Sequence, residues 1–582
     1  MSLGRLIGWL GTTRYIERRL ALLALLMSLP CLGNGFSADD FDLRDQLETL
    51  GPFEAYHFTS CDPARARAAQ LRDMQLGLAP WWTDPESRQC LFRPLASSSL
   101  WLDFRLWPRA PWLMLLENCL LYAAIVLGVG LMYRRLGLSG VALGLATFFY
   151  ALNAPHAMSV GWISARNTLL ATCFAVLTWL MHERGVTAMS TRARWTARFV
   201  AWLAFAASIS SAEFGLSALA YVVSYALWLD PRPVARRVGR LVPYALLTLA
   251  WAVVYVRGGY GAVRLAFYHD VIGDPFGSLL RLAYSIPVYV ASQIAFPFAT
   301  LHALSARGPW LVALLALIVL ALTWRLFAAP LLRDPTARFL LGGAAFSVAQ
   351  LVATVPQDCI AWFVGIGVTG LLAQVLADRQ GPPTEATPAH SRGTLALLRV
   401  HALWLPLLFL PHLFAGLTRG FGGGARALDR ALPHGTQPTV VLFNSPTQHV
   451  PRYVFRKRAH DGVSQPAVFT LYAGASQSVV RRLDDHRIEL HVAGGWLANK
   501  LEQTRDLQRA PFRVGDVVAL PRFFASVLEV NAKGCTTRVQ FRFAQALDGG
   551  AYAFYCWRGR KPERCQLLSP GEQLVLDPVS AI

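Results

Sequence analysis

The chain has 582 residues, of which 54% are hydrophobic and 15% are charged, and its mean hydropathy is +0.37. Soluble proteins of this length rarely have such a composition, whereas proteins with many membrane-spanning helices do. The formal net charge of +20 comes from arginines in short clusters between apolar runs, which is typical of orientation signals and argues against a nucleic-acid groove.

The first apolar run, Leu20 to Leu32, is short and is preceded by a basic segment. A secretory signal peptide needs a small-residue cleavage site, and Ser28-Leu29-Pro30-Cys31 offers no good one. The run therefore predicts an uncleaved first span with its N-terminus in the cytoplasm. The basic residues before it are Arg5, Arg14, Arg18 and Arg19.

A cluster of acids follows this run, where the chain leaves the membrane. Asp39, Asp40 and Asp42 place three carboxylates within four residues. Adjacent carboxylates repel each other, so one of them ionises only at a higher pH unless a metal ion or a basic group lies nearby. Carboxylates at a membrane edge are costly and usually functional, while the alternative is a solvated acidic turn. The local sequence leaves both interpretations open.

Residues 34–111 form a long polar loop that we expect outside the membrane. Its tryptophans and prolines, including Trp81-Trp82, suit a segment lying on the outer leaflet, and loops of this length are usually lids or binding loops. Asp84 and Arg93 are a candidate exposed ion pair, which would contribute little stability. Cys61 and Cys90 share the loop with no third cysteine, so they predict a disulfide if the loop faces an oxidising compartment.

Further apolar runs are each near the length needed to cross a bilayer. Arginine clusters fall in every second connection between them, which predicts that these connections are cytoplasmic. Together with the first run they give about eleven spans. The runs are 113–132, 138–154, 163–181, 197–211, 214–229, 241–256, 309–327, 338–355, 359–377 and 395–416.

Residues 280–300 are also apolar but contain Arg281, Pro287, Gln293 and Pro297. If this segment crosses, two arginine clusters lie outside, and if it forms a re-entrant or interfacial helix, both lie inside. We expect the second arrangement, because the basic bias then holds in every connection. The Gly381-Pro382-Pro383-Thr384 stretch is predicted to be a cytoplasmic linker.

The spacing of apolar residues along the chain changes in residues 430–582. Alternating apolar and polar residues at 487–492 and 537–543, punctuated by glycines, predict short strands and turns. We expect a small all-β domain, an antiparallel sandwich or barrel, following an all-α polytopic membrane domain over residues 1–420. An odd number of spans places it outside. Cys535, Cys556 and Cys565 lie there and are candidates for a second disulfide.

The order of several short motifs resembles the multi-spanning C-type glycosyltransferases over about residues 15–420. The most similar members are bacterial relatives of the protein O-mannosyltransferases and the tetratricopeptide-repeat mannosyltransferases. The C-terminal region has no tetratricopeptide pattern. The motifs are the acidic pair Asp39-Asp40, Phe92-Arg93-Pro94-Leu95, Asn153-Ala154-Pro155-His156, Gly161-Trp162-Ile163-Ser164-Ala165-Arg166 and Ser211-Ala212-Glu213.

The resemblance implies a polyprenyl- or dolichyl-phosphate sugar donor, an outward-facing active site, and an acid of the first loop as base or metal ligand. By position, Asp39 and Asp40 match the acidic pair, His156 and Arg166 match the His and Arg that flank the fourth span, and Glu213 matches the acid of a Ser-Lys-Glu motif.

The sequence departs from the family pattern at three places. Ala212 stands where the Ser-Lys-Glu motif has lysine, and Tyr122 stands where relatives often have a histidine after Asn118. Gln357-Asp358-Cys359 replaces a common Pro-x-Asp-Arg. The missing lysine and arginine weaken the expected binding of an anionic donor.

Inverting sugar transfer needs a carboxylate to take the acceptor proton and positive charge on the phosphate leaving group. Asp39 or Asp40 is the candidate base, and Asp40 is the candidate ligand of a divalent metal ion. Arg166 is the candidate for the donor phosphate, because arginine binds phosphate bidentately, with His156 beside it. The alternatives are an outer-leaflet anchor for Arg166 and a helix-end residue for His156.

Asp84, Arg93 and Glu213 are the remaining candidates to line the site. The alternative for Glu213 is a solvated loop tip, because burying an unpaired acid is costly.

The sequence therefore predicts a glycosyltransferase of the bacterial inner membrane, with the C-terminal domain in the periplasm. It would move a hexose or pentose from a polyprenyl-phosphate donor to a glycan, lipid or protein acceptor, in contact with membrane lipids and without nucleic acid. One alternative is a non-catalytic relative acting as a scaffold or assembly factor. The other is a lipid or polysaccharide transporter, which should show inverted repeats that the sequence lacks.

Overall fold

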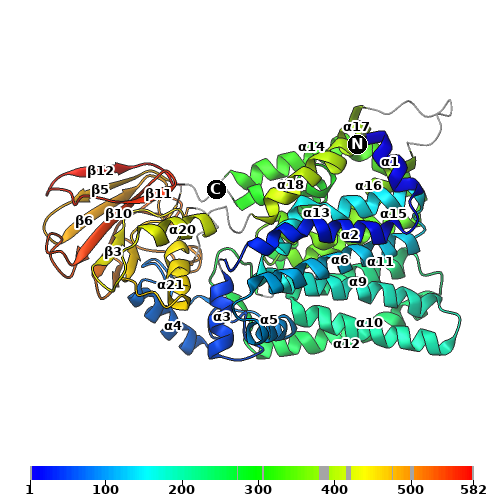
Figure 1. Ribbon diagram of the computed structural model, residues 1–582, viewed down its shortest axis with the longest axis horizontal. Coiled ribbons are helices and arrows are strands. Elements are labelled where there is room, and N and C mark those ends of the chain that lie inside the picture. Colours follow the sequence, from blue (N-terminus) through cyan, green and yellow to red (C-terminus); the bar gives the residue numbers. More distant parts are fainter. Residues whose placement is uncertain are drawn as a thin grey trace.

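The computed structural model describes residues 3–37, 39–271, 273–303, 307–378, 392–414, 421–474, 476–498 and 504–579. A helical bundle forms one part and a C-terminal region rich in strands forms the other, with helices α3, α4 and α5 between them (Figure 1). The predicted linker at 381–384 lies outside the described residues.

The helices up to residue 414 are joined by connections of different length, with long ones before α4, α5 and α13. Three-residue strands β1, Arg88–Cys90, and β2, Gly261–Val263, pair antiparallel within this part. The helices are α1 Leu3–Thr12, α2 Ile16–Ser28, α3 Asp39–Thr49, α4 Pro63–Leu76, α5 Pro94–Leu106, α6 Pro111–Arg135, α7 Gly140–Ala151, α8 Ala154–Val160, α9 Arg166–Thr187, α10 Thr191–Ser211, α11 Ala218–Trp228, α12 Val234–Arg257, α13 Pro275–Ile294, α14 Gly308–Arg333, α15 Pro335–Leu351, α16 Trp362–Asp378, α17 Arg392–Arg399 and α18 Leu405–Leu413.

Single turns of 3₁₀-helix link several of these helices. A π-helical turn, η6 Val400–Trp404, joins α17 to α18. The 3₁₀ turns are η1 Leu29–Gly33, η2 Ile163–Ala165, η3 Glu213–Ser217, η4 Ala299–Ala303 and η5 Asp358–Ile360.

Local sequence explains where several helices begin and end. Asp62 caps α4 by accepting a hydrogen bond from the Arg65 backbone N–H, Pro63 follows at the first helical position, and Gly77 ends the helix at a φ of 77°. A side chain at Gly77 would also meet the Val468 carbonyl oxygen, because a Cβ there would lie 2.3 Å from it. Gly77 therefore lets the first loop approach the C-terminal region closely.

Each apolar run predicted to span falls on a helix, but the number of spans is not confirmed. Among the described residues, five helices are long and apolar enough to cross a membrane, and α7 and α16 are shorter apolar helices. These findings support a polytopic membrane protein. The five are Pro111–Arg135, Ile163–Thr187, Val234–Arg257, Gly308–Arg333 and Arg392–Leu413.

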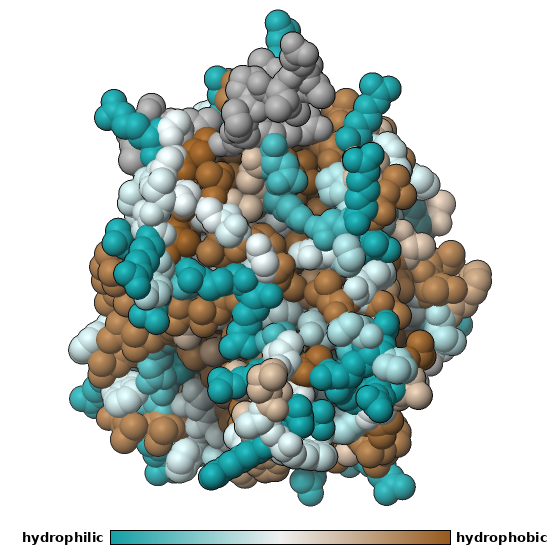
Figure 2. Space-filling model, turned by 90° about the vertical axis from the view of Figure 1, so that its right-hand side faces the viewer, coloured by the Kyte–Doolittle hydropathy of each residue, from teal (hydrophilic) through white to brown (hydrophobic). Residues whose placement is uncertain are grey.

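Several connections rich in arginine meet at one end of the bundle, far from the C-terminal region (Figure 1). Arg134 and Arg135 at the end of α6 pair with Glu17 and Glu183, and Arg232 donates to the Val186 carbonyl oxygen over 2.6 Å. Viewed from this end, hydrophilic residues spread between apolar patches (Figure 2). This grouping agrees with the arginine pattern of the sequence.

Both flanks of α13 contact the same segment, residues 353–358. Before the helix, the His269 backbone N–H donates to the Ala353 carbonyl oxygen over 2.9 Å. After it, the Thr300 hydroxyl donates to the Asp358 carboxylate over 2.8 Å. A helix whose two flanks meet one segment fits the expected re-entrant or interfacial arrangement, and α13 is not among the five candidate spans. Its non-crossing topology stays a prediction.

In its described residues, the C-terminal region contains two sheets and two helices. The six-stranded sheet is antiparallel in the order β12-β5-β6-β9-β8-β7, and the four-stranded sheet has the order β11-β10-β3-β4. The helices are α20 Phe421–Ala431 and α21 Val450–His460. The strands are β3 Thr439–Leu442, β4 Val468–Thr470, β5 Ser478–Arg482, β6 Arg487–Val492, β7 Val517–Ala519, β8 Phe523–Val530, β9 Thr536–Phe543, β10 Tyr552–Arg558, β11 Lys561–Arg564 and β12 Gln573–Leu576.

The strands expected at 487–492 and 537–543 are confirmed as β6 and β9, but the expectation of an all-β, antiparallel domain is wrong. Strand β3 runs parallel to both β4 and β10, and α21 forms the crossover between β3 and β4. Parallel neighbours require such a connection. The signal overlooked in the sequence is the helical spacing of Val450, Tyr453 and Val454, the buried apolar residues of α21 besides Pro451.

The first loop shares a hydrophobic core with the C-terminal region. Trp81 and Trp82 are each 1% exposed, and their Nε1 atoms donate to the Leu471 carbonyl oxygen over 3.0 Å and to Gln448 over 3.2 Å. The expectation that these tryptophans lie on the outer leaflet is therefore wrong. Indole rings bury well where their N–H finds a partner, and the partner here comes from about 390 residues further along the chain.

Candidate active site

A cavity of about 670 Å³ lies where the first loop meets the bundle and the loops around α13. Asp39, Arg93 and Glu213 line it, and Arg509 reaches it from the C-terminal region. Aromatic rings form much of the remaining wall, including Trp162, Trp251, Tyr255, Tyr260, Phe267 and Tyr268. A large pocket with few convergent charged groups is the usual form of a ligand site.

Asp39 begins α3 and faces this cavity. The Tyr453 hydroxyl donates to its Oδ1 over 2.7 Å. Among the described residues, no hydrogen-bond donor reaches Oδ2. Burial raises the pKa of Asp39 to about 6, while the Tyr453 hydrogen bond opposes that rise. A carboxylate with a pKa near the working pH suits a general base.

Asp40 lies behind the cavity wall and is 1% exposed. Its Oδ1 accepts hydrogen bonds from the Ser164 backbone N–H over 2.8 Å and from the Ser164 hydroxyl, and its Oδ2 accepts from the Ser37 backbone N–H over 2.8 Å. Burial raises the pKa of Asp40 to about 7, against these hydrogen bonds. Asp40, the other candidate base, does not line the cavity, because its side chain joins α3 to the turn before α9.

These contacts do not suit a metal ligand at Asp40, since N–H and O–H donors surround both of its oxygens. In the described part of the chain, one cluster of three candidate ligands lies close together: His57, Cys61 and Cys90. Two of its members are joined in a disulfide. The divalent metal ion stays a prediction.

Arg93 and Glu213 form an ion pair in the cavity wall, with Arg93 Nε 2.8 Å from Glu213 Oε2. Their side chains are 18% and 20% exposed. Arg93 also lies over the Tyr56 ring, with its guanidinium carbon 5.0 Å from the ring centre. The bond uses Nε, and among the described residues neither Nη group has a hydrogen-bond partner. Glu213 thus reaches the cavity and is not a solvated loop tip.

Arg166 lies outside the cavity lining and is 1% exposed. Its Nη2 lies 3.1 Å from Asp103 Oδ2. Its hydrogen bonds engage all three nitrogens of the guanidinium away from the cavity, so the expectation that Arg166 binds the donor phosphate is wrong. The other acceptors are Asn118 Oδ1 at 2.5 Å, Glu117 Oε2 at 2.6 Å, the Met114 carbonyl oxygen at 2.6 Å and Ser99 Oγ at 3.0 Å.

The structure also separates His156 and Asp84 from the cavity. His156 is buried and stacks on Trp362 with ring centres 4.1 Å apart, which makes it part of the bundle core. Asp84 pairs with Arg264 over 2.7 Å, so the expected Asp84–Arg93 pair is wrong. Asp84 helps to join the first loop to the loop that follows α12.

Two further charged residues line the cavity and were not singled out from the sequence. Arg509 Nη2 lies 3.6 Å from Asp270 Oδ2, and both residues belong to the lining. Arg505 holds this part of the C-terminal region in place by donating to the carbonyl oxygens of Trp82 over 2.9 Å and Thr83 over 3.2 Å. No local sequence signal pairs segments so far apart.

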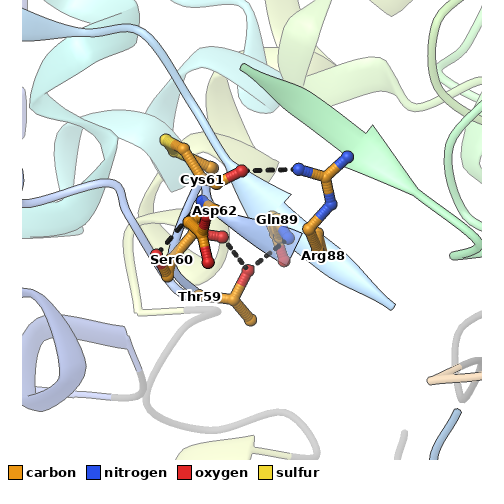
Figure 3. The surroundings of a disulfide bond; sticks show 7 residues. Thr59, Ser60, Cys61, Asp62, Arg88 and Gln89 are labelled. Atoms are coloured by element: carbon orange, nitrogen blue, oxygen red, sulfur yellow. Dashed lines mark hydrogen bonds between the residues drawn. A yellow bond between two sulfur atoms is a disulfide. The ribbon is translucent and has the colours of Figure 1, made fainter. Parts of the chain in front are cut away.

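The predicted disulfide between Cys61 and Cys90 is confirmed, with the two Cα atoms 5.3 Å apart. Around it, Arg88 Nη1 donates to the Cys61 carbonyl oxygen over 2.5 Å and the Gln89 backbone N–H donates to the Thr59 hydroxyl over 2.8 Å (Figure 3). Gln89 lines the cavity, so the disulfide braces one wall. Cys556 and Cys565 form a second disulfide.

No family model and no curated protein matches the chain. Several solved structures align over most of it, among them these three. ArnT from Cupriavidus metallidurans in the apo state is 14% identical, with 77% of this chain and 88% of that chain covered and a TM-score of 0.36. The archaeal oligosaccharyltransferase AglB from Archaeoglobus fulgidus, in complex with an inhibitory peptide and a dolichol-phosphate, is 12% identical, with coverages of 79% and 65% and a TM-score of 0.36.

Arabinosyltransferase EmbB from Mycobacterium smegmatis is a third neighbour, 14% identical, with 81% of this chain and 44% of that chain covered and a TM-score of 0.31. The structure neighbours are multi-spanning C-type glycosyltransferases. This is the superfamily that the order of sequence motifs resembles. The chain spans less than two thirds of the length of AglB and EmbB. With TM-scores below 0.5, the likeness carries no argument about the reaction.

Proposed function

We propose that the protein is a membrane glycosyltransferase that moves a sugar from a polyprenyl-phosphate donor to an acceptor on the side of the membrane that holds the cavity. The observation that carries the proposal is that one cavity is lined by both Asp39 and Arg93. The first is a carboxylate able to take a proton. The second is a guanidinium with unused donors.

In this reaction the Asp39 carboxylate takes the proton of the acceptor hydroxyl. At the same time the oxygen of that hydroxyl forms a bond to the anomeric carbon of the sugar. The bond between that carbon and the donor phosphate oxygen breaks, and the phosphate leaves with the electron pair. The Nη groups of Arg93 offer a planar pair of donors for the departing phosphate. Charge that develops on the leaving group is stabilised best by groups already in place.

Helix α12 supports a lipid-linked donor. Only 6% of the 18-residue apolar stretch of α12 is buried inside the protein. Nearly all of this stretch is therefore exposed, and in a membrane it would contact lipid. Trp251 and Tyr255 of the same helix line the cavity. A polyprenyl tail in the bilayer would therefore lie against α12 while its phosphate and sugar enter the cavity, where aromatic rings offer apolar faces to the sugar.

The test is transfer by the purified full-length protein in lipid nanodiscs, supplied with labelled polyprenyl-phosphate hexoses and pentoses and a membrane extract as acceptor. We expect label in a glycan, lipid or protein product. Asp39→Asn should reduce the rate by roughly 10²–10⁴. Asp485→Asn, an exposed change in the C-terminal region, is the matched control and should keep the wild-type rate. Absence of transfer from every donor would favour the scaffold alternative.

A further inference from the structure

Helix α21 of the C-terminal region packs directly against α3, the helix that begins with Asp39. Arg456 Nη1 lies 2.7 Å from Asp45 Oδ2, and Arg452 Nε lies 3.1 Å from Asp42 Oδ1. Both arginine side chains are 19% exposed. Asp42 is 4% exposed and Asp45 is 40% exposed, so the pair at Asp42 is the less screened of the two contacts between the helices.

The same face of α21 presents Tyr453, which is 7% exposed. Its hydroxyl donates to Asp39 Oδ1 over 2.7 Å. The hydroxyl belongs to the crossover between β3 and β4, so the sheet of the C-terminal region determines where it lies. The partner residues are 414 positions apart in the chain.

We propose that the C-terminal region is a working part of the catalytic site, with Tyr453 as the positioning residue that orients the Asp39 carboxylate and favours its ionised form. This inference rests on the proposed function. It assigns to residues beyond the membrane domain a role in the chemical step and not only in packing.

The physical reason is the asymmetry of a hydrogen bond between a hydroxyl donor and a carboxylate. A Tyr O–H donates to the ionised form and therefore lowers the pKa of Asp39, against the larger rise caused by burial. Without the hydroxyl, the pKa of Asp39 should rise further and less of the base should be ionised at a given pH.

Other charged or titratable groups lie near Asp39 or line the same cavity. Asp42 opposes its ionisation and Arg452 favours it. Because a Tyr453→Phe change leaves all of them in place, a shift of the pH profile in this variant reports on the hydroxyl alone. The groups are Asp40 and Asp42 on α3, Arg452 on α21, Tyr268 beside the cavity, and Arg93 and Glu213 in the shared lining.

The experiment is the pH dependence of kcat and KM for wild type and Tyr453→Phe, measured in nanodiscs with the active polyprenyl-phosphate donor. Since a hydrogen bond contributes about 0.5–1.5 kcal/mol, the acid limb of kcat should move up by roughly 0.4–1 pH unit. The rate should then fall about two- to fivefold at pH 6 and recover almost fully at pH 8, with donor KM changed less than about twofold. A uniform loss at every pH, or an unchanged profile, would overturn the proposal.

Tyr555→Phe is the matched control. Its hydroxyl donates to the Ala431 carbonyl oxygen over 3.4 Å within the C-terminal region, and Tyr555 does not line the cavity. This variant should keep the wild-type profile. Should Tyr453→Phe not accumulate, Tyr453→Met retains apolar bulk without the hydroxyl and should give the same upward shift.

A second measurement does not depend on activity. Dicyclohexylcarbodiimide modifies protonated carboxyls in apolar surroundings, and mass spectrometry can follow the labelling of Asp39 from pH 5 to 8. The labelling midpoint should lie higher in Tyr453→Phe than in wild type. Equal midpoints would refute the role of Tyr453 even if transfer occurs. A shifted midpoint without transfer by the wild type would uphold the contact and reject the proposed function.

Discussion

Arg166 and Arg93 both face carboxylates near the same end of the bundle, but they differ in how many of their donors are already used. Arg166 is 1% exposed, and each of its three guanidinium nitrogens already has a hydrogen-bond partner. Arg93 is 18% exposed and bonds Glu213 through Nε, on the wall of a cavity. A fully satisfied charge holds a structure together, whereas one with unused donors in a cavity is available to a ligand.

The largest expected effect is on stability, at the Arg166 cluster. Arg166→Ala leaves Asp103 and Glu117 without their cation. Because the loss of one partner strands buried charge, the free energy of unfolding should fall by about 3–5 kcal/mol. Unfolding in mixed detergent micelles measures it. Arg105→Ala, a change at an exposed arginine of α5, is the control. Full stability with lost transfer would place Arg166 in the site after all.

Arg93→Ala should show the opposite pattern. Removing one group that stabilises developing charge typically costs about 10²–10³ in kcat, while the pair is partly exposed and contributes only about 1 kcal/mol to stability. Transfer assays and unfolding on the same preparation measure both quantities. Arg93→Lys should recover little activity, since a point charge does not replace the planar fork. A loss of stability as large as that of Arg166→Ala would erase the distinction between the two clusters.

A smaller effect is expected in the pH dependence of the transfer rate, which tests Asp39 as the base. The pKa of Asp39 is raised to about 6, and a base acts only when it is deprotonated. The rate should therefore rise with pH, by about tenfold between pH 5 and pH 7, and level off above. The thermal stability should move the other way and decrease as pH rises from about 4 through 6, because the folded protein binds the proton more tightly than the unfolded chain. A rate that is flat across this range would exclude Asp39 as the base.

The smallest expected effect is at a surface pair of the first loop. Arg67 lies 3.0 Å from Glu86, and the two side chains are 61% and 44% exposed. Arg67→Ala should change the free energy of unfolding by less than about 0.5 kcal/mol and leave transfer unchanged. A large effect on stability or on transfer would mean that any close pair of opposite charges matters in this fold, whether it is buried or exposed.

The sequence predicts which segments meet, but it does not predict which of their side chains line the cavity. The order of motifs brings the acidic pair, the first loop and Glu213 to one end of the bundle. Whether Asp39 or Asp40 faces the cavity depends on where α3 begins and how α21 packs on it, and neighbours on a helix point about 100° apart. Arg93 directly precedes α5 and Arg166 begins α9, so residue type and local position do not distinguish them and only the tertiary contacts do.

The C-terminal region shows the same limit. Alternation at 487–492 and 537–543 predicts the strands β6 and β9, because a strand half buried in a sheet requires it. The parallel pairing of β3 and the crossover helix α21 depend on contacts between segments that show no local signal. Tyr453 and Arg509 therefore could not be assigned to the site from residues 430–582 alone.

The burial of Trp81 and Trp82 has a consequence for the order of events on the ribosome. Trp81 donates to a carbonyl 390 positions later in the chain, and synthesis at 5–20 residues per second separates the two by roughly 20–80 s. During that interval the two indoles lack the C-terminal residues that bury them in the folded protein. The core around these tryptophans is therefore completed only after a segment translated much later has folded against the first loop.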